Sequence, residues 1–249
     1  MAGNAEPRTL GGYINRKPSA RVGEEPAFAI RLRPWSETSL LVDFITKHYG
    51  RITARARGAK RPTSPWRGIL AEFSPLLIGW SGGGATKNLT KVEWMGGFSP
   101  IEGDALLSGF YMNELILRLT AKEDPEEGIF DAYWEALRVL SGQEPEDGVE
   151  VALRRFEMQL LRLTGYGFPS EFQNGYYVLR GAELVRTGGE PSGSEPSYPA
   201  TSLREMAKLD FSRPETARAA KALLRARIAA VAGDRPLSSR RIIAELKRL

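Results

Sequence analysis

The chain has 249 residues, of which 42% are hydrophobic, enough for one large globular domain or two ordinary ones. It has no cysteine, which excludes disulfides, thiolate metal ligands and cysteine nucleophiles. The formal net charge is +5, but residues 1–100 carry 15 basic and seven acidic side chains, whereas residues 101–150 carry three basic and 13 acidic ones. This uneven charge indicates an anionic partner that meets the protein at particular faces. Without an apolar run of about 18 residues or a signal-peptide pattern, we expect a cytoplasmic protein that does not enter a membrane.

The first part of the chain predicts a tail followed by a small barrel. Residues 1–25 are rich in Gly, Pro, Arg and Glu without sustained periodicity, which is typical of a mobile tail. Residues 26–97 contain five stretches with strand-like alternation, and turns with Gly or Pro separate them. These strands predict a five-stranded antiparallel barrel. The natural candidate is an OB-fold, whose open face commonly holds single-stranded nucleic acid.

The most basic stretch of the chain runs from Lys47 to Arg67 and contains seven Lys or Arg residues and no acid. Within it Arg51, Arg55 and Arg57 alternate with Ile or Ala, so a strand here would have one packed and one solvated face. Guanidiniums along the solvated face can neutralise a polyanion backbone without reading its bases. The plainer interpretation is a solvated sheet face, which is what most charge runs are.

We therefore predict a DNA-binding site on the barrel, where cations contact phosphates and aromatic rings stack on bases. The predicted phosphate contacts are Arg31, Arg33, Arg51, Arg55, Arg57, Lys60, Arg61, Arg67, Lys87 and Lys91. Tyr49 and Trp66 are the candidate stacking platforms, and a place in the barrel core is the open alternative for both.

The apolar period changes to about 3.6 residues after Gly96 and Gly97, which predicts a helical domain over residues 98–249. The expected helices cover residues 103–119, 129–140, 149–163, 203–209 and 215–231, and a last one begins at Ser238 or Ser239. Residues 168–200 are expected to form an irregular lobe with weak strand pairs at 176–179 and 184–186.

Catalytic chemistry finds little support in the sequence. His48 is the single histidine, so neither a Ser/His/Asp triad nor a structural zinc site is expected. The segment Gly82–Lys87 lacks the spacing of a phosphate-binding loop. We predict a binding protein without catalytic residues, metal or cofactor. The alternatives are a metal-dependent nuclease that uses the acidic helices and a non-catalytic protein–protein adaptor.

Four segments resemble the RecO family of bacterial recombination mediators. They are RLRPWSETSLLVDFITKHYGRITARARGAKRPTSPWRGIL, LLSGFYMNELILRLT, LRRFEMQLLRLTGYG and RPLSSRRIIAEL, and they follow the family's order from about Phe28 to Leu246. The resemblance implies an OB-fold followed by a helical domain, and a role in recombinational repair without ATP hydrolysis. It further implies binding of single- and double-stranded DNA, annealing of complementary strands, and nucleoid association.

The resemblance also implies protein partners. Family members act with RecR to place recombinase, an indirect partner, on strands coated by single-strand-binding protein. Many members carry a cysteine-ligated zinc element after the segment that matches Gly165–Gly167. This chain has no cysteine there, so we expect a zinc-free lobe held by packing of Phe172, Tyr176 and Tyr177.

Single-strand-binding proteins end in a short acidic tail with a terminal aromatic residue, which suits an apolar groove edged by cations. In the helix expected at 215–231, Arg218, Lys221 and Arg225 share a face beside an apolar stripe that includes Leu224 and Ile228. We predict the tail-binding site here. The open alternatives are that these cations extend the DNA footprint or only keep the helix soluble.

Overall fold

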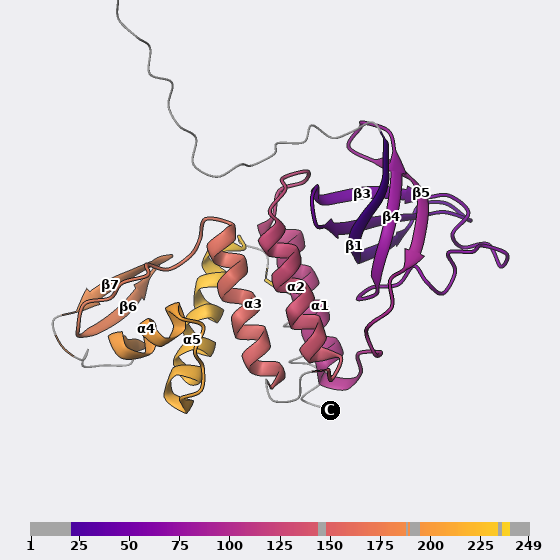
Figure 1. Ribbon diagram of the computed structural model, residues 1–249. Helices are drawn as coiled ribbons and strands as arrows, with labels where there is room; N and C mark the ends of the chain where they lie inside the picture. The colour runs from indigo at the N-terminus through magenta and orange to yellow at the C-terminus, as the bar shows by residue number, and fades with distance from the viewer. Residues whose placement is uncertain (1–20, 144–147, 188, 190–194, 234–235, 240–249) are drawn as a thin grey trace, which may run out of the picture.

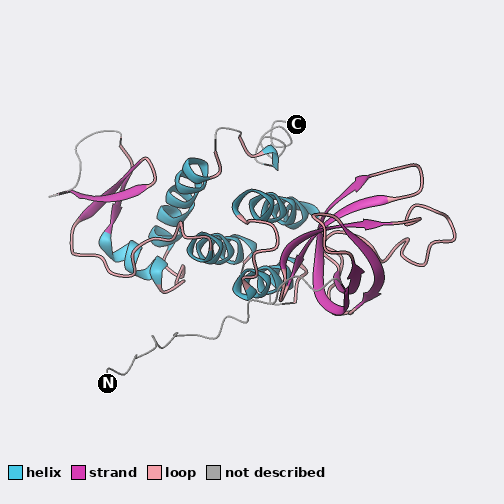
Figure 2. Cartoon of the chain, turned by 90° about the horizontal axis from the view of Figure 1, so that it is seen from above, coloured by secondary structure: helices cyan, strands magenta, loops and turns pink. Residues whose placement is uncertain are grey.

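The computed structural model describes residues 21–143, 148–187, 189, 195–233 and 236–239. The molecule is elongated, with a barrel at one end, a small sheet at the other, and helices between them (Figure 1). The view in Figure 2 shows the same order of layers. No helix among the described residues has the length and apolar character needed to cross a membrane. Residues 1–20 of the predicted tail and most of the helix predicted after Ser238 lie outside the described residues.

The predicted five-stranded barrel of OB type is confirmed. Its strands are β1 (Arg21–Pro34), β2 (Leu40–Thr46), β3 (Gly50–Ala56), β4 (Pro75–Ser81) and β5 (Lys87–Trp94). They close in the order β1-β2-β3-β5-β4. The barrel is not antiparallel throughout, because β3 and β5 pair in parallel at Ala54 and Lys87. A closed ring with an odd number of strands cannot alternate direction at every joint, so one parallel pair is a geometric necessity.

The first strand begins earlier than the sequence predicts. Residues 21–25 were expected in the mobile tail, but β1 starts at Arg21 and pairs with β4 from Arg21–Ser81 onward. The polar composition of residues 21–25 does not predict a strand. Glu25 is buried through a specific contact with His48, which periodicity cannot detect. Its carboxylate accepts a hydrogen bond from the His48 backbone N–H at 2.6 Å and lies 3.0 Å from His48 Nδ1. His48 therefore fixes the turn between β2 and β3 through its contacts with Glu25.

A shift of register in β1 turns its large side chains away from the barrel core. The pairing with β2 is irregular between Ala29 and Arg31. As a result Ala29 points into the barrel, whereas Phe28 and Ile30 join the core of the helical half. The ring of Phe28 lies 5.1 Å from Tyr133, centroid to centroid. A strict alternation of period two would place Phe28, Ile30 and Leu32 together on the core side of the barrel, because it cannot register an extra residue.

The helices are α1 (Gly103–Leu119), α2 (Glu127–Leu140), α3 (Val149–Leu163), α4 (Ala200–Ala207) and α5 (Pro214–Val231). The first and third coincide with the predicted segments. The second begins two residues before the predicted Ile129, because the Glu126 carboxylate accepts a hydrogen bond from Gly128 N–H at 3.3 Å and caps the helix. The fifth begins with Pro214 in its first turn, as predicted.

The lobe at 168–200 contains regular structure. Strands β6 (Tyr176–Arg180), β7 (Glu183–Thr187) and β8 (Ser197–Pro199) form a sheet in the order β7-β6-β8. The helical half is therefore not purely α. The two predicted strand pairs are present, and β8 was missed because a three-residue strand carries too little alternation to detect. Phe172 packs edge-on against Tyr177 at 5.3 Å between ring centroids, in line with a lobe held by aromatic packing.

Candidate nucleic-acid interface

The outward face of β1, β2 and β3 consists of side chains that pair across the strands in successive rows. The rows are Phe28–Ile45–Arg51, Arg31–Asp43–Thr53 and Arg33–Leu41–Arg55. Phe28 and Ile45 are buried in the core of the helical half, so helices cover the first row. The second and third rows lie progressively farther along the strands. Beyond them come Arg57 and the turn at 35–39, whose residues 35–37 are exposed. Solvent exposure on this face therefore increases with distance from the helices.

Arg51, a predicted phosphate contact, lies in the contact between the two halves. Its Nε donates to Thr120 Oγ1 at 3.1 Å and its Nη2 to the Thr120 carbonyl at 2.7 Å. The residue is only 9% exposed, and burial lowers the pKa of the Arg51 guanidinium. The structure thus corrects the prediction that Arg51 points into solvent. It does point outward from the barrel, but the segment after α1 covers it.

Lys87 departs from the prediction for the same reason. Its side chain is 1% exposed, and Nζ lies 3.0 Å from Glu123 Oε1. The same ammonium donates to the Gly84 carbonyl at 2.9 Å. A buried ammonium held by a carboxylate and a carbonyl cannot reach a phosphate in solvent. Lys87 is therefore a link between β5 and the α1–α2 connection, which consists of residues 120–126.

The backbone of β3 touches this connection directly. Glu123 N–H donates to the Arg51 carbonyl at 2.9 Å. Gly50 has a φ of +65°, and a Cβ at this position would lie 2.1 Å from the Asp124 carbonyl oxygen. Both the left-handed conformation and the close approach require glycine here. We call the set of contacts from Gly50, Arg51 and Lys87 to residues 120–124 the seam.

Arg31 and Arg33 are held on the sheet by one buried carboxylate. Asp43 Oδ2 lies 2.8 Å from Arg31 Nε and 3.2 Å from Arg33 Nη2, and Thr53 Oγ1 donates to Asp43 Oδ1 at 2.7 Å. Burial would raise the pKa of Asp43, but the Thr53 hydrogen bond and the two guanidiniums outweigh it and lower the pKa. Both arginine side chains remain more than 40% exposed, at 43% and 44%. Their outer edges are thus available to a ligand while their orientation is fixed.

The remaining predicted cations of the basic stretch lie on and beyond the end of β3. Arg55 is half-buried and its Nη2 donates to Asn88 Oδ1 at 2.7 Å, whereas Arg57, Arg61 and Arg67 are exposed. No carboxylate in the described part of the chain forms an ion pair with these three exposed arginines. Lys60 is also exposed, and its Nζ lies 3.4 Å from the Ser36 carbonyl.

Seven of the ten predicted phosphate contacts thus lie on the outer face of β1 and β3 or in the loop that follows β3, outside the seam. We call this region the distal cationic face, and it consists of Arg31, Arg33, Arg55, Arg57, Lys60, Arg61 and Arg67. Arg51 and Lys87 belong to the seam. Lys91 lies on β5, with Nζ 2.5 Å from Glu24 Oε1 and 3.2 Å from Glu93 Oε2, and hydrogen bonds to these acids raise its pKa. Its charge is already neutralised.

The two predicted stacking platforms pack against the barrel. The Tyr49 ring meets Trp80 edge-on at 5.1 Å, and Trp66 is partly buried against the same core. The core alternative is thus the one that the structure supports. Trp35, which the alternation of the sequence does not single out, is 58% exposed in the turn between β1 and β2. The sequence does indicate this exposure. Trp35 follows Pro34 and precedes a polar turn, which offers no apolar neighbour to cover the ring.

The predicted tail-binding groove on α5 is not open. Leu224 and Ile228 are both 0% exposed and belong to the core of the helical half. Lys221 Nζ lies 2.8 Å from Glu150 Oε1, so its charge is paired. Arg218 and Arg225 are exposed, but they border no apolar surface made by that stripe. The helical spacing was correct, and the apolar stripe faces the interior because α5 packs against α3 and α4.

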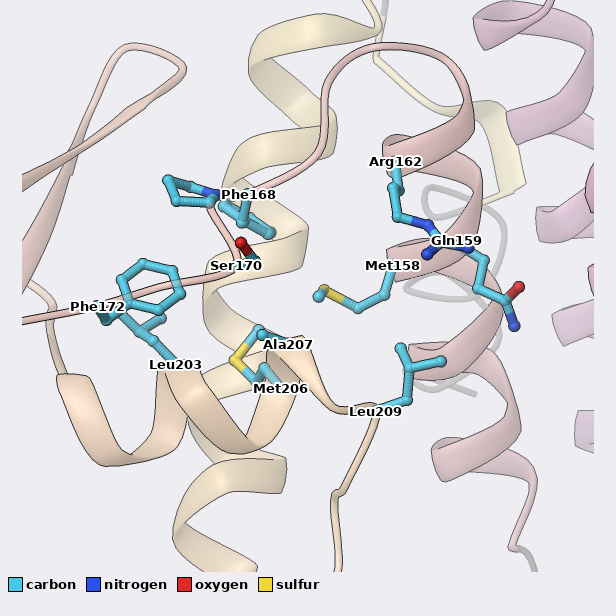
Figure 3. Close-up of a pocket in the computed structure, with 11 residues that line it drawn as sticks. Met158, Gln159, Arg162, Phe168, Ser170, Phe172, Leu203, Met206, Ala207 and Leu209 are labelled. Carbon is cyan, nitrogen blue, oxygen red and sulfur yellow. The ribbon is translucent and has the colours of Figure 1, made fainter. Parts of the chain in front are cut away.

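An apolar hollow does lie elsewhere on the helical half, between α3 and α4. Its volume is about 170 Å³, and Met158 and Met206 point into it from the two helices (Figure 3). Apolar side chains dominate the lining, which includes Phe168, Phe172, Leu203 and Leu209. Arg162, exposed near the end of α3, contributes a cation to its edge.

Two acidic residues of the helices, Glu157 and Glu114, serve structural contacts. Buried Glu157 accepts a hydrogen bond from Tyr111 Oη at 2.5 Å and lies 2.8 Å from Arg154 Nη1. Glu114 accepts hydrogen bonds from the backbone N–H groups of Ser238 and Ser239, both at 2.9 Å. Within the described ranges, no group of three His, Cys, Asp or Glu side chains is placed to hold a metal ion.

The fold and the site define a two-domain protein in which an OB-type barrel presents a cationic face and a helical half is fixed to it. Family models agree with this division. The model described as "Recombination protein O N terminal" matches residues 22–98, and "Recombination protein O C terminal" matches residues 102–241. The chain belongs to the RecO family.

Curated relatives match over nearly the whole chain. The DNA repair protein RecO of Aromatoleum aromaticum is 41% identical over 241 residues, covering 92% of this chain and 98% of that protein. The protein of the same name from Polynucleobacter necessarius is 40% identical over 244 residues, covering 93% and 99%. That of Azoarcus sp. is 39% identical over 243 residues, covering 92% and 98%.

Removal of the Asp43 charge should change how stability depends on pH. Its pKa is lower in the folded chain than in the unfolded chain, where it is about 3.9. The carboxylate therefore stabilises the fold above about pH 4, and this contribution is lost as the pH falls through the folded-state pKa. Asp43→Asn should cost about 1–3 kcal/mol at pH 7, and its unfolding free energy should decline less steeply below pH 4 than that of the wild type.

Urea denaturation at a series of pH values measures this difference. Asp131→Asn is the matched control, because that carboxylate is 59% exposed and lies 3.5 Å from Lys47 Nζ. An exposed pair of this kind contributes little, so the control should follow the wild type. Parallel curves for Asp43→Asn and the wild type would show that the buried carboxylate does not anchor the two arginines.

Proposed function

We propose that the chain is a non-catalytic recombination mediator that binds DNA on the distal cationic face. The observation that carries the proposal is a set of seven cations outside the seam, two of which, Arg31 and Arg33, are held by the buried Asp43 carboxylate. Exposed Lys and Arg side chains displace counterions from phosphates, which supplies affinity without base recognition. Membership of the RecO family supports a role in DNA repair.

Contacts of this kind suit both single- and double-stranded DNA, because both present phosphates. They also support annealing of complementary strands without an energy source. Neutralised phosphates on two strands repel each other less, so the barrier to pairing falls. With RecR, the protein would help to load recombinase onto strands coated by single-strand-binding protein in the cytoplasm, near the nucleoid. This step rests on the family resemblance.

Loss of two exposed arginines should weaken DNA binding regardless of sequence. We expect Arg57→Ala/Arg61→Ala to lower the affinity for both oligo-dT and duplex. The slope of log affinity against log salt concentration should shrink by about 1.4 for single strands and about 1.8 for duplex, because two phosphate contacts are lost. Fluorescence anisotropy at several salt concentrations measures both quantities.

Lys91→Ala/Lys221→Ala is the control, because it removes the same net charge from two lysines already paired with carboxylates. An unchanged slope in the arginine variant, or an equal loss in the control, would argue against the distal cationic face. The same mixtures with Mg²⁺ or Mn²⁺ test the nuclease alternative, which predicts shortened strands. An adaptor without DNA affinity would show no binding at any salt concentration.

We propose that the tail of single-strand-binding protein binds the hollow between α3 and α4, and not the face of α5. A hollow of about 170 Å³ can hold one aromatic ring, since an apolar cavity of about 150 Å³ accepts benzene. Arg162 at its edge supplies a cation for an acidic peptide. Arg227 donates to the Tyr166 carbonyl at 3.0 Å and lies over the Phe168 ring, which steadies one wall.

A carboxylate placed in this hollow should exclude the acidic tail. We expect Met158→Glu to reduce the affinity for a labelled tail peptide by about tenfold or more, because loss of one buried apolar anchor costs about 1–2 kcal/mol. Its DNA affinity should stay that of the wild type. Arg218→Glu/Arg225→Glu on α5 should bind the peptide normally. The reverse pattern, with a loss only in the α5 variant, would return the site to α5.

A further inference from the structure

Trp35 is an exposed aromatic side chain at the open end of the barrel. At 58% exposure it exceeds every other large hydrophobic side chain in the described residues except Trp94, at 60%. A tryptophan in solvent leaves a large apolar area in contact with water, which folding alone would not favour. Exposure alone does not identify a ligand, because Trp94 is equally exposed, so the residues around Trp35 decide what its ring could bind.

The turn that holds Trp35 has a fixed shape. The Trp35 backbone N–H donates to the Ser39 carbonyl at 3.0 Å, which continues the pairing of β1 with β2 beyond Pro34. Ser39 N–H in turn donates to Ser36 Oγ at 3.2 Å. Since Arg31 and Arg33 alternate outward on β1, this pairing places residue 35 next in their series. Because its backbone is already fixed, the turn loses little conformational entropy when the Trp35 ring binds a ligand.

The same turn is tied to the cations of the loop after β3. Lys60 N–H donates to the Thr38 carbonyl at 3.0 Å, and Gly58 N–H lies 3.4 Å from Ser39 Oγ. These bonds hold the residues beside Arg57 and Arg61 against the tryptophan turn. The turn also contains one exposed acid, Glu37, which reduces but does not cancel the local positive charge.

We infer that Trp35 is a stacking platform for an unpaired base of DNA, which rests on the proposed binding of DNA at the distal cationic face. In OB-type barrels the loop between the first two strands borders the face that holds oligonucleotides. Phosphates on the cations would direct the bases of a single strand toward the indole, and every base has a flat face to stack. In a duplex those faces are covered by neighbouring base pairs. The ring therefore adds affinity for single strands alone.

Substitution of Trp35 should separate single-strand from duplex binding. We expect Trp35→Ala to weaken oligo-dT binding by about tenfold, as stacking of one base contributes about 1–3 kcal/mol. Duplex affinity should stay within about twofold of the wild type, and the salt slope should not change, because no phosphate contact is lost. Trp35→Phe should keep most of the affinity, and Trp35→Leu should lose it, which distinguishes stacking from simple apolar contact.

Trp94→Ala is the matched control, because Trp94 is equally exposed but lies at the end of β5, beside Phe73 and Phe98 in a cleft next to α1. It should bind both DNA forms normally. Quenching of tryptophan emission by oligo-dT gives a second measurement on folded protein, and Trp35→Phe should remove most of the quench. The quenching measurement tests the stacking role even if Trp35→Ala does not fold.

The outcomes separate the platform from the site on which it rests. Equal losses for single strands and duplex in Trp35→Ala, or a full quench in Trp35→Phe, would overturn the stacking role. A normal Trp35→Ala beside a weakened Arg57→Ala/Arg61→Ala would reject the platform and leave DNA binding at the distal cationic face standing. Normal binding in both variants would reject the face itself.

Discussion

Two long cations from the barrel, Arg51 and Lys87, hold it to the connection between α1 and α2. A buried charge is tolerated only where partners replace its water, and here Thr120 and Glu123 supply them. Gly50 lets the two backbones approach closely at the same place. Together with Phe28 among the helix aromatics, these contacts fix how the barrel sits on the helices. The position of the helices then decides which part of the barrel stays open.

The seam thereby divides the basic residues of the barrel into two groups. Cations near the helices join the two halves, and those farther along the strands remain in solvent. Asp43 orders the cations next to the seam. It fixes Arg31 and Arg33 in place while leaving about two-fifths of each side chain exposed. Cations already held in position lose less side-chain entropy when they bind a phosphate. The turn with Trp35 ends the same face, so charge and aromatic surface meet at its open end.

Much of the fold follows from periodicity in the sequence. Alternation of period two located the five barrel strands, and the 3.6-residue period located α1 and α3 to the residue. Periodicity failed at β1, where an extra residue turned Phe28 and Ile30 outward and where Glu25 is buried for its bond to His48. It also missed β8, which is too short to show a pattern.

The candidate site was predictable in composition but not in exposure. A period of two tells which face a residue lies on, and Arg51 does lie on the outer face. It cannot tell that a segment from 69 residues later covers that face. The same limit applies to Leu224 and Ile228, whose stripe was correctly identified but faces the core. Trp35 was missed for the opposite reason, since its exposure results from the turn in which it sits.

Hydrogen–deuterium exchange of the whole chain, with and without oligo-dT, shows where on the protein DNA binds. If free charge lies only beyond the seam, bound DNA should slow exchange in residues 33–41 and 55–67. Exchange at residues 120–124 and in α5 should stay unchanged. Slower exchange confined to the helical half, with none at 33–41 or 55–67, would contradict the account.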